Sequence, residues 1–125
     1  MLHGLLLCVA TQPLELRGTE QFYDNLPSKS RWFVMFYAPW CGHCKAMETE
    51  WAELSTILSS STMGVASVDA TAHEELAAMY QVNGFPSLQL LSDGKVFEYA
   101  GERSVEAMRA FAEGGFEGDG PHARP

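Results

Sequence analysis

The sequence has few basic residues, few cysteines and no long apolar run. Of its 125 residues, 8 are Lys or Arg and 16 are Asp or Glu, and the formal net charge is −8 at pH 7. Nucleic acids and anionic membrane surfaces are bound through basic patches, so this charge balance argues against both as partners. The apolar run Leu5–Ala10 is too short to cross a bilayer. We therefore expect no membrane span.

Three cysteines are too few for a small secreted scaffold that is held together by disulfides. They are Cys8, Cys41 and Cys44. If Cys8 belongs to a segment that is removed, only the Cys41/Cys44 pair remains, and a redox-active pair fits this pattern better than a structural one. The sequence also has no nucleotide, flavin or metal motif, so we predict no cofactor.

Length and composition predict one domain with its own core, because 46% of the residues are hydrophobic. We place this domain at residues 11–113. Residues 1–10 are interpreted as the hydrophobic part of a secretory signal or as a ragged N-terminus. Residues 114–125 contain four glycines and two prolines. We expect them to form a flexible tail without a core.

The pattern of apolar residues and turn signals predicts strands that alternate with helices. The apolar run at residues 31–38 is typical of a central strand buried on both faces, and Asp93-Gly94 is a typical hairpin turn. The expected strands are residues 14–16, 31–38, 65–68, 87–91 and 96–99. The expected helices are residues 20–26, 41–59, 71–80 and a last helix after Ser104. The order β-α-β-α-β-α-β-β-α predicts an α/β fold with a central mixed sheet flanked by helices.

The segment Trp40-Cys41-Gly42-His43-Cys44-Lys45 lies between the central strand and the following helix. Cys41 is expected at the first turn of that helix, where backbone N–H groups without helical partners stabilise a thiolate. A protonated His43 and Lys45 add positive charge nearby. Two sulfurs three positions apart, one of them favoured as the thiolate, meet the requirements of thiol–disulfide exchange.

Two other interpretations of the cysteine pair remain open. A structural zinc site needs four ligands, but the remaining candidates are scattered and form no second pair at ligand spacing. Those candidates are His3, Cys8, His73 and His122. Two buried, inert cysteines are the other interpretation, although the glycine and histidine between them fit an exposed tight turn better. Haem attachment is excluded, because Lys45 rather than His follows the second cysteine.

Four motifs, in order, resemble a catalytic domain of the protein disulfide isomerase family. The run Phe36–Lys45 (FYAPWCGHCK) resembles the active-site segment of that family. The other three are Val68–Thr71 (VDAT), Val82–Leu88 (VNGFPSL) and Tyr99–Arg103 (YAGER). The likeness extends from about residue 14 to residue 113 and implies a single thioredoxin-like domain with the thioredoxin fold.

The resemblance implies a role for each residue of the CGHC motif. Cys41 is expected to be the exposed nucleophile and Cys44 the resolving thiol of a redox-active disulfide, with Gly42 between them. His43 stabilises the thiolate and so makes the disulfide more oxidising. Since thioredoxins usually carry proline at this position, His43 favours oxidase or isomerase work.

Residues outside the motif are also assigned roles by the resemblance. Pro86 is expected to follow a cis peptide bond beside the cysteines. Trp40, Phe85 and Pro86 are expected to contact an extended substrate chain, much as in strand addition. Arg103 is expected to swing toward Cys44 and lower its pKa during reoxidation.

Two positions depart from the family pattern as we align it. The family buries a Glu where this chain has Met35, and we align its Lys partner with Gln89. The absence of both charged residues is physically consistent, because either the Glu or the Lys without its partner would be an uncompensated buried charge. We therefore expect slower resolution of mixed disulfides than in relatives that carry the carboxylate.

Together these patterns predict an enzyme, a thiol–disulfide oxidoreductase of the protein disulfide isomerase type. Its expected substrates are cysteine-containing unfolded or partly folded proteins, with glutathione or a redox protein as partner. The resemblance implies the endoplasmic reticulum lumen or the secretory pathway, although the chain ends without a KDEL-like signal; a cytoplasmic location is the alternative. Two other functions are considered: a thioredoxin-like protein reductant and a chaperone or adaptor domain that binds chains without turnover.

Overall fold

The computed structural model describes residues 13–17 and 19–118. It contains one five-stranded sheet with the strand order β1-β3-β2-β4-β5. The strands are β1 (Leu14–Glu15), β2 (Arg31–Tyr37), β3 (Met63–Asp69), β4 (Ser87–Ser92) and β5 (Lys95–Tyr99). The strands β1, β3 and β2 are parallel, whereas β4 runs antiparallel to both of its neighbours. The predicted mixed sheet is confirmed.

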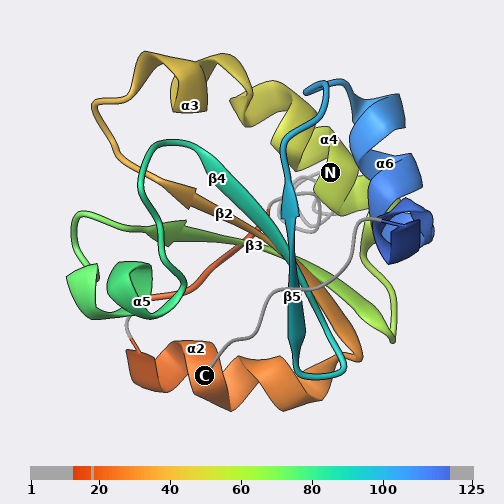
Figure 1. The fold of residues 1–125 in the computed structure, drawn as a ribbon, viewed down its shortest axis with the longest axis horizontal. Helices are drawn as coiled ribbons and strands as arrows, with labels where there is room; N and C mark the ends of the chain where they lie inside the picture. Colours follow the sequence, from red (N-terminus) through yellow and green to blue (C-terminus); the bar gives the residue numbers. More distant parts are fainter. Residues whose placement is uncertain (1–12, 18, 119–125) are drawn as a thin grey trace, which may run out of the picture.

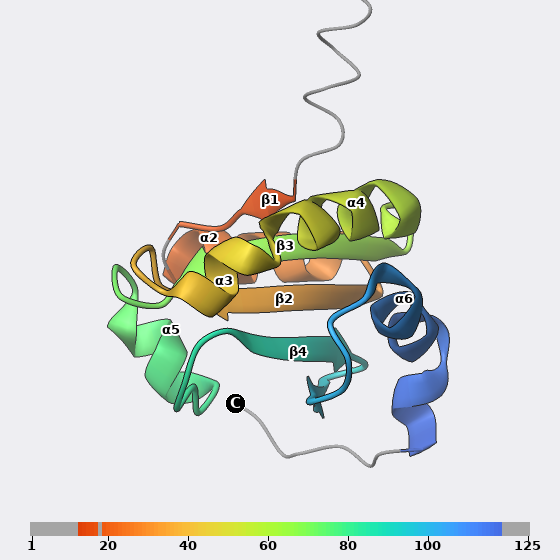
Figure 2. The same ribbon diagram turned by 90° about the horizontal axis from the view of Figure 1, so that it is seen from above.

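Helices cover both faces of this sheet (Figure 1). The α-helices are α2 (Thr19–Asn25), α3 (Gly42–Ala46), α4 (Glu48–Leu58), α5 (Glu74–Met79) and α6 (Val105–Glu113). Helices α4 and α6 contribute to one hydrophobic cluster, and α2 and α5 to the other. Figure 2 shows α3 and α4 on the same side of the sheet. The predicted thioredoxin fold, with its order of strands and helices, is confirmed.

The central strand is buried as its composition predicts. The five residues from Trp32 to Phe36 are buried and alternate between the two hydrophobic clusters. The ring of Trp32 lies over Gly64 on β3, where a Cβ atom would come within 2.4 Å of the ring. Position 64 therefore has to be glycine if the neighbouring strands are to hold this register.

The predicted helix at residues 41–59 is wrong as a single helix. It is divided at Met47, whose N–H donates to the carbonyl of Cys44, three residues back. This tighter turn ends α3, and α4 begins at Glu48. The residues that the sequence predicted to face inward from this helix are nevertheless buried: Met47, Trp51, Leu54 and Leu58.

The predicted helix at residues 71–80 begins later than expected, at Glu74. The carboxylate of Asp69 accepts hydrogen bonds from the backbone N–H groups of Thr71 and Ala72. These bonds hold a turn between β3 and α5, because an Asp side chain competes with the helix for nearby backbone donors. Asp69 is thus a turn-forming residue.

The expectation of a coreless tail from Gly114 is wrong at its start. A 3-10 helix, η2 (Gly115–Gly118), follows α6, and Phe116 within it is buried. Its ring packs against those of Phe97 and Phe111, with the Arg31 guanidinium 4.5 Å from its centroid. A single large aromatic residue was enough to fold this glycine-rich segment onto the core. Residues 1–12 and 119–125, with Cys8 and the rest of the predicted tail, lie outside the described residues.

Candidate active site

Cys41 caps the N-terminus of α3, directly beyond the carboxyl end of β2. Its backbone N–H donates to the carbonyl of Ala38 at 3.1 Å, which turns the chain between strand and helix. Its sulfur accepts a hydrogen bond from the N–H of Cys44 at 3.4 Å. Both cysteines are free thiols. The strand–turn–helix arrangement predicted around the CGHC motif is therefore confirmed.

The pKa of Cys41 is lowered from its ordinary value. The hydrogen bond from the Cys44 thiol is the main cause, and the backbone N–H groups of Cys44 and His43 and the charge of Arg103 add to it. Burial acts in the opposite direction. His43 itself has an exposed side chain and acts on this sulfur through its backbone.

Burial raises the pKa of Cys44 to about 11, and its hydrogen bond to Cys41 acts in the same direction. A backbone hydrogen bond with Ala38 and the charge of Arg103 oppose the shift. The exposed fraction is 3% for Cys44 and 7% for Cys41, so Cys41 is not the openly exposed thiol that the resemblance implied. The exposed fractions of the two residues differ little, and the pKa values of the two thiols are separated by the burial of Cys44 and by the hydrogen bonds at each sulfur.

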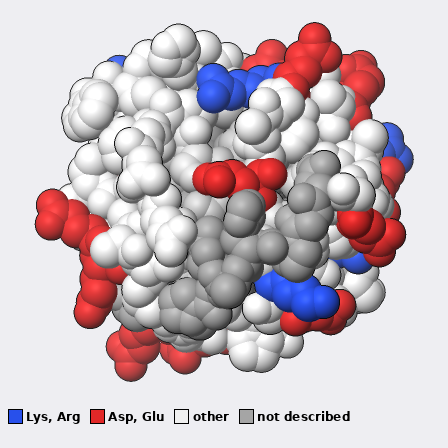
Figure 3. Space-filling view, in the orientation of Figure 1, with Lys and Arg blue, Asp and Glu red and all other residues white. Residues whose placement is uncertain are grey.

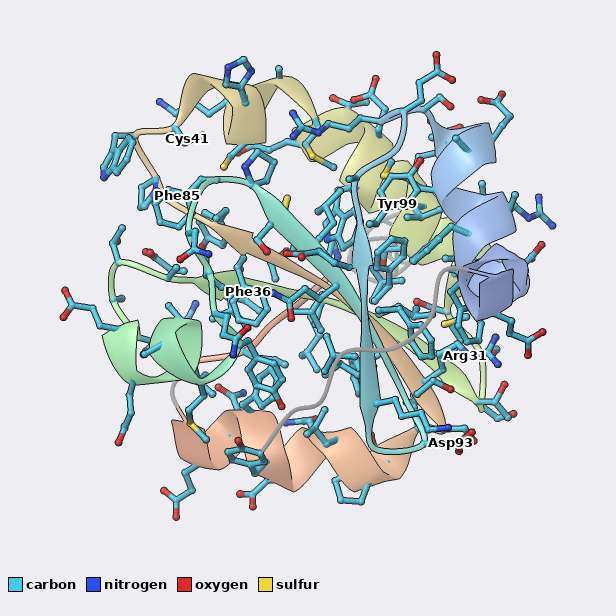
Figure 4. All side chains as sticks on the ribbon, viewed as in Figure 1. Arg31, Phe36, Cys41, Phe85, Asp93 and Tyr99 are labelled. Atoms are coloured by element: carbon cyan, nitrogen blue, oxygen red, sulfur yellow. The ribbon has the colours of Figure 1, made fainter. Side chains whose placement is uncertain are left out.

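The loop before β4 brings Phe85 and Pro86 to Cys41. The thiol of Cys41 donates to the carbonyl of Phe85 at 3.6 Å, and the Phe85–Pro86 peptide bond is cis, as expected. Trp40 is 70% exposed and packs edge-on against the ring of Phe85 at a centroid distance of 5.7 Å. Figure 4 shows Cys41 and Phe85 next to each other at one corner of the fold. Of the three expected substrate-contact residues, Phe85 contacts the sulfur of Cys41, Pro86 follows Phe85 in the chain, and Trp40 packs against the Phe85 ring.

A groove of about 460 Å³ runs beside this loop. Its walls come from residues 81–88 before and within β4 and from residues 98–103, with Arg103 among them. The charge of Arg103 lowers the pKa of both cysteines, so the structure brings this residue to the site. The corner of the molecule over α3 carries few charged side chains (Figure 3).

Gly42 is the site residue whose type the geometry explains least. Nothing lies within 4 Å of a Cβ atom built on it. A side chain at this position would extend into open space, so packing does not require glycine here.

Our alignment of the family's ion pair with Met35 and Gln89 is wrong for Gln89. Gln89 is opposite Val34 in the β2–β4 register, so its side chain lies on the other face of the sheet from Met35. The residue beside Met35 on the same face is Ser67 of β3. Sequence spacing alone did not reveal this, because a shift of one residue along a strand reverses the face.

Gln89 is fully buried and supports the Phe85 loop instead. Its Nε2 donates to the carbonyl of Tyr80 at 3.0 Å and to the Oγ of Ser87 at 3.1 Å. These two partners are at opposite ends of the segment that carries Phe85 and Pro86. Gln89 therefore ties both ends of this loop to the sheet.

Two further residues near the site had no signal in the sequence. The hydroxyl of Tyr37, at the end of β2, donates to the Oε2 of Glu15 at 2.8 Å. Burial raises the pKa of Glu15, although the hydrogen bond from Tyr37 and the charges of Arg17 and His73 act in the opposite direction. Tyr37 and Glu15 are 22 positions apart, so only the pairing of strands brings them together.

The described part of the chain has neither a spanning helix nor a cation-binding cluster. No helix within it has the length and apolar character to cross a membrane. In residues 13–17 and 19–118, no three His, Cys, Asp or Glu side chains form a group that could hold a metal ion. The zinc interpretation of the cysteine pair therefore gains no support from these residues.

Comparison with known proteins identifies the domain. The Thioredoxin family model matches residues 14–114. A thioredoxin domain-containing protein of Theileria parva is 44% identical over 87 residues, which are 69% of this chain and 39% of that protein. Mouse protein disulfide-isomerase A6 is 41% identical over 92 residues, which are 69% of this chain and 21% of that protein. The chain thus spans between a fifth and two fifths of these relatives.

Solved structures agree with this result. The J-Trx1 fragment of ERdj5 superposes with a TM-score of 0.75 at 28% identity, covering 86% of this chain and 53% of the other. The first thioredoxin domain of mouse protein disulfide-isomerase A4 gives a TM-score of 0.71 at 31% identity, covering 86% and 76%. These relatives support thiol–disulfide oxidoreductase chemistry in broad terms. The chain belongs to the thioredoxin family, as a single thioredoxin-like domain with protein disulfide isomerases among its homologues.

Proposed function

We propose that this domain is a protein disulfide isomerase-type oxidoreductase that uses Cys41 as nucleophile and Cys44 as resolving thiol. The observation that carries the proposal is the contrast between the two sulfurs. The pKa of Cys41 is lowered by donors at the start of α3, whereas burial raises that of Cys44 to about 11. One thiol is therefore prepared to attack while the other is kept protonated.

The reaction follows from this order of ionisation. The thiolate of Cys41 attacks one sulfur of a substrate disulfide, and the other substrate sulfur leaves as a thiolate. The Cys44 thiol then loses its proton and attacks the sulfur of Cys41, which releases the second substrate thiolate. The substrate gains two electrons and the pair becomes a disulfide. The reverse sequence oxidises a substrate dithiol.

The groove beside Pro86 is proposed to bind the substrate chain. The exposed ring of Trp40 and the ring of Phe85 offer an apolar contact next to the attacking sulfur. An unfolded or partly folded protein presents both apolar side chains and accessible disulfides, and it can lie in the groove in an extended form. Glutathione or a redox protein would restore the starting state of the cysteine pair.

The proposed location is the lumen of the endoplasmic reticulum or the secretory pathway. Its support is the similarity to protein disulfide isomerases, together with the His in the CGHC motif, which favours a more oxidising pair. An oxidising compartment is where such a pair finds disulfides to rearrange.

The first experiment equilibrates the Cys41–Cys44 pair with a series of glutathione buffers. We expect a reduction potential near about −180 mV, the value of protein disulfide isomerase, rather than about −270 mV, the value of thioredoxin. A potential near the thioredoxin value would overturn the isomerase proposal in favour of a protein reductant.

A non-turnover adaptor is the second candidate, and the exposed Trp40 beside Phe85 favours it, because an aromatic surface also suits simple chain binding. The Cys41→Ser variant separates the two functions. The isomerase proposal requires that this variant lose refolding activity toward a reduced, disulfide-containing protein. An adaptor would retain its full effect on the substrate without the thiol.

A further inference from the structure

A cavity of about 360 Å³ lies beside Cys44, on the face of the sheet that α3 and α4 cover. Its walls include Met35 and Tyr37 of β2, Ser67 of β3 and Trp51 of α4, besides Cys44 itself. This volume is large enough for several water molecules, and polar atoms of Ser67 and the backbone are available to bind them. The cavity therefore provides a path for protons between Cys44 and the sheet.

Resolution of a mixed disulfide requires that Cys44 lose its proton. Burial raises the pKa of the Cys44 thiol, so at pH 7 this thiol is protonated before it attacks. A group close to the sulfur has to accept its proton as the sulfur attacks. Met35 and Ser67, which form the adjacent cavity wall, carry no carboxylate or imidazole.

A half-buried acid of the sheet, Glu15, is reached through Tyr37. Its hydroxyl donates to the Oε2 of Glu15 at 2.8 Å, and Glu15 is beside Ser67 in the β1–β3 register. Glu15 therefore lies on the same face as the cavity, one strand farther from Cys44. The charged groups that act on it are Arg17, which follows β1, Asp69 at the end of β3, and His73 before α5.

We propose that Tyr37 and Glu15 take up the proton that Cys44 releases during resolution, through water in this cavity. The inference rests on the proposed function. The Cys44 thiol gives its proton to a water molecule, and the water passes a proton to the oxygen of Tyr37. Tyr37 gives its own proton to the carboxylate of Glu15. The electron pair left on the Cys44 sulfur forms the bond to Cys41, and the substrate thiolate leaves.

One other acceptor, Glu48, meets the same cavity at its open side, where it is exposed to solvent. The exposed Lys45 also contributes to the walls, but its ammonium group has no lone pair to accept a proton. An exposed carboxylate exchanges its proton with bulk water and offers no fixed partner for a buried thiol. Glu48 is therefore the matched control for Glu15: it has the same chemistry and borders the same cavity, but it is exposed to water.

The test measures the resolution step alone. A fluorescent peptide is attached to Cys41 as a mixed disulfide at about pH 4, where Cys44 is fully protonated. A stopped-flow jump to pH values between about 5 and 9 then starts the attack of Cys44, and release of the peptide reports its rate. The proteins compared are the unmodified chain, Glu15→Gln, Tyr37→Phe and Glu48→Gln.

We expect the rate of the unmodified chain to rise with the ionisation of Glu15 and then level off. In Glu15→Gln and in Tyr37→Phe it should fall by about tenfold at pH 7 and increase in proportion to hydroxide across the whole range. Glu48→Gln should behave as the unmodified chain. Alkylation of Cys41 should be unchanged in all four proteins, because the relay does not touch this sulfur.

Equal rates and pH profiles in all four proteins would overturn the relay and leave the proposed function intact. If the unmodified chain releases no peptide at any pH, the proposed function fails, and the relay fails with it. Tyr37→Phe retains the ring and its packing, so it carries the test alone if Glu15→Gln does not fold. A loss in Glu15→Gln with none in Tyr37→Phe would also count against the relay.

Discussion

The surroundings of Cys41 and Cys44 differ, although Cys41 caps the same five-residue helix, α3, that contains Cys44. On the Cys41 side, the sulfur meets backbone donors, the carbonyl of Phe85 and a groove that is open to solvent. On the Cys44 side, the sulfur lies against a cavity walled by Met35 and Ser67. The same functional group thus has a lowered pKa in one place and a raised pKa in the other.

The motif supplies both sulfurs, and the surroundings of each sulfur give the two thiols different pKa values. Backbone N–H groups at the start of α3 stabilise negative charge on Cys41. Burial opposes negative charge on Cys44, and the charge of Arg103 offsets only part of this effect. Attack and resolution are therefore different chemical problems, and each can be disturbed separately.

The largest expected effect comes from removing one sulfur at a time. Cys41→Ser should abolish exchange, because the thiol that remains in the described residues, that of Cys44, is buried and has a raised pKa. Cys44→Ser should still attack substrates but accumulate the mixed disulfide, since nothing resolves it. Gel electrophoresis without reductant, after acid quenching and alkylation, separates these states. If both variants accumulated the mixed disulfide equally, Cys41 and Cys44 would not have different roles.

The second prediction compares the thiols by their alkylation rates across pH. Cys41 should react with iodoacetamide at least about a hundredfold faster than Cys44 at pH 7, because its thiolate fraction is larger. The rate at Cys41 should level off at a lower pH than the rate at Cys44, which should continue to rise until about pH 11. Mass spectrometry of partly modified protein gives both rates. The two profiles would coincide if the surroundings did not matter.

The third prediction changes the Cys44 side by giving its cavity a direct acid. Met35→Glu combined with Ser67→Lys places an ion pair on neighbouring strands of the same face. We expect resolution to accelerate about tenfold, because a carboxylate then lies on the cavity wall that also contains Cys44. The pH-jump release of peptide measures this rate.

Met35→Glu with Gln89→Lys is the matched control for that double variant. Gln89 faces the other side of the sheet, so the lysine cannot pair with the new carboxylate. Each charge would be buried alone, and the protein should lose about 3–5 kcal/mol of stability. Similar stability and rate in the two double variants would show that the assignment of faces is wrong.

The smallest effect is expected on the Cys41 side, from Gln89→Met. Methionine fills a similar volume but cannot donate to Tyr80 or Ser87, so the buried carbonyl of Tyr80 loses this bond. Unfolding in urea should show a loss of about 1–3 kcal/mol. The looser Phe85 loop should raise the KM for a protein substrate by a few fold while resolution stays unchanged. Ser87→Ala, which removes only one of the two partners, should give a smaller change.

The predictable part of the fold was the part with a strong local pattern. The apolar strand around Trp32 and the Asp93-Gly94 turn were correctly predicted, and both turn residues have positive φ, as this kind of hairpin requires. The break at Met47 was missed because no proline or glycine marks it. The packing of Phe116 was missed because a glycine-rich segment has no periodicity, and one buried ring decided its conformation.

In the candidate site, too, residues within motifs were predicted and residues brought in by the sheet were not. The sequence identified Cys41, Cys44, Phe85 and Pro86 through their motifs. Spacing along the strands did not identify Ser67 as the neighbour of Met35. No motif or spacing indicated that Glu15 lies near the site. Such residues become visible only when the register of the sheet is known, because the register fixes which side chains share a face.

By itself the sequence determined the order of strands and helices and the position of Cys41 at a helix start. These features depend on residues within a few positions of one another, and local hydrogen bonds and periodicity encode them. Only the tertiary structure decided that the carbonyl of Phe85 meets Cys41, 44 positions away, and that Tyr37 meets Glu15. The burial of the two sulfurs and the proposed proton path depend on parts of the chain that only strand pairing brings together. The tertiary structure therefore sets the pKa values of the two thiols, and the local sequence does not.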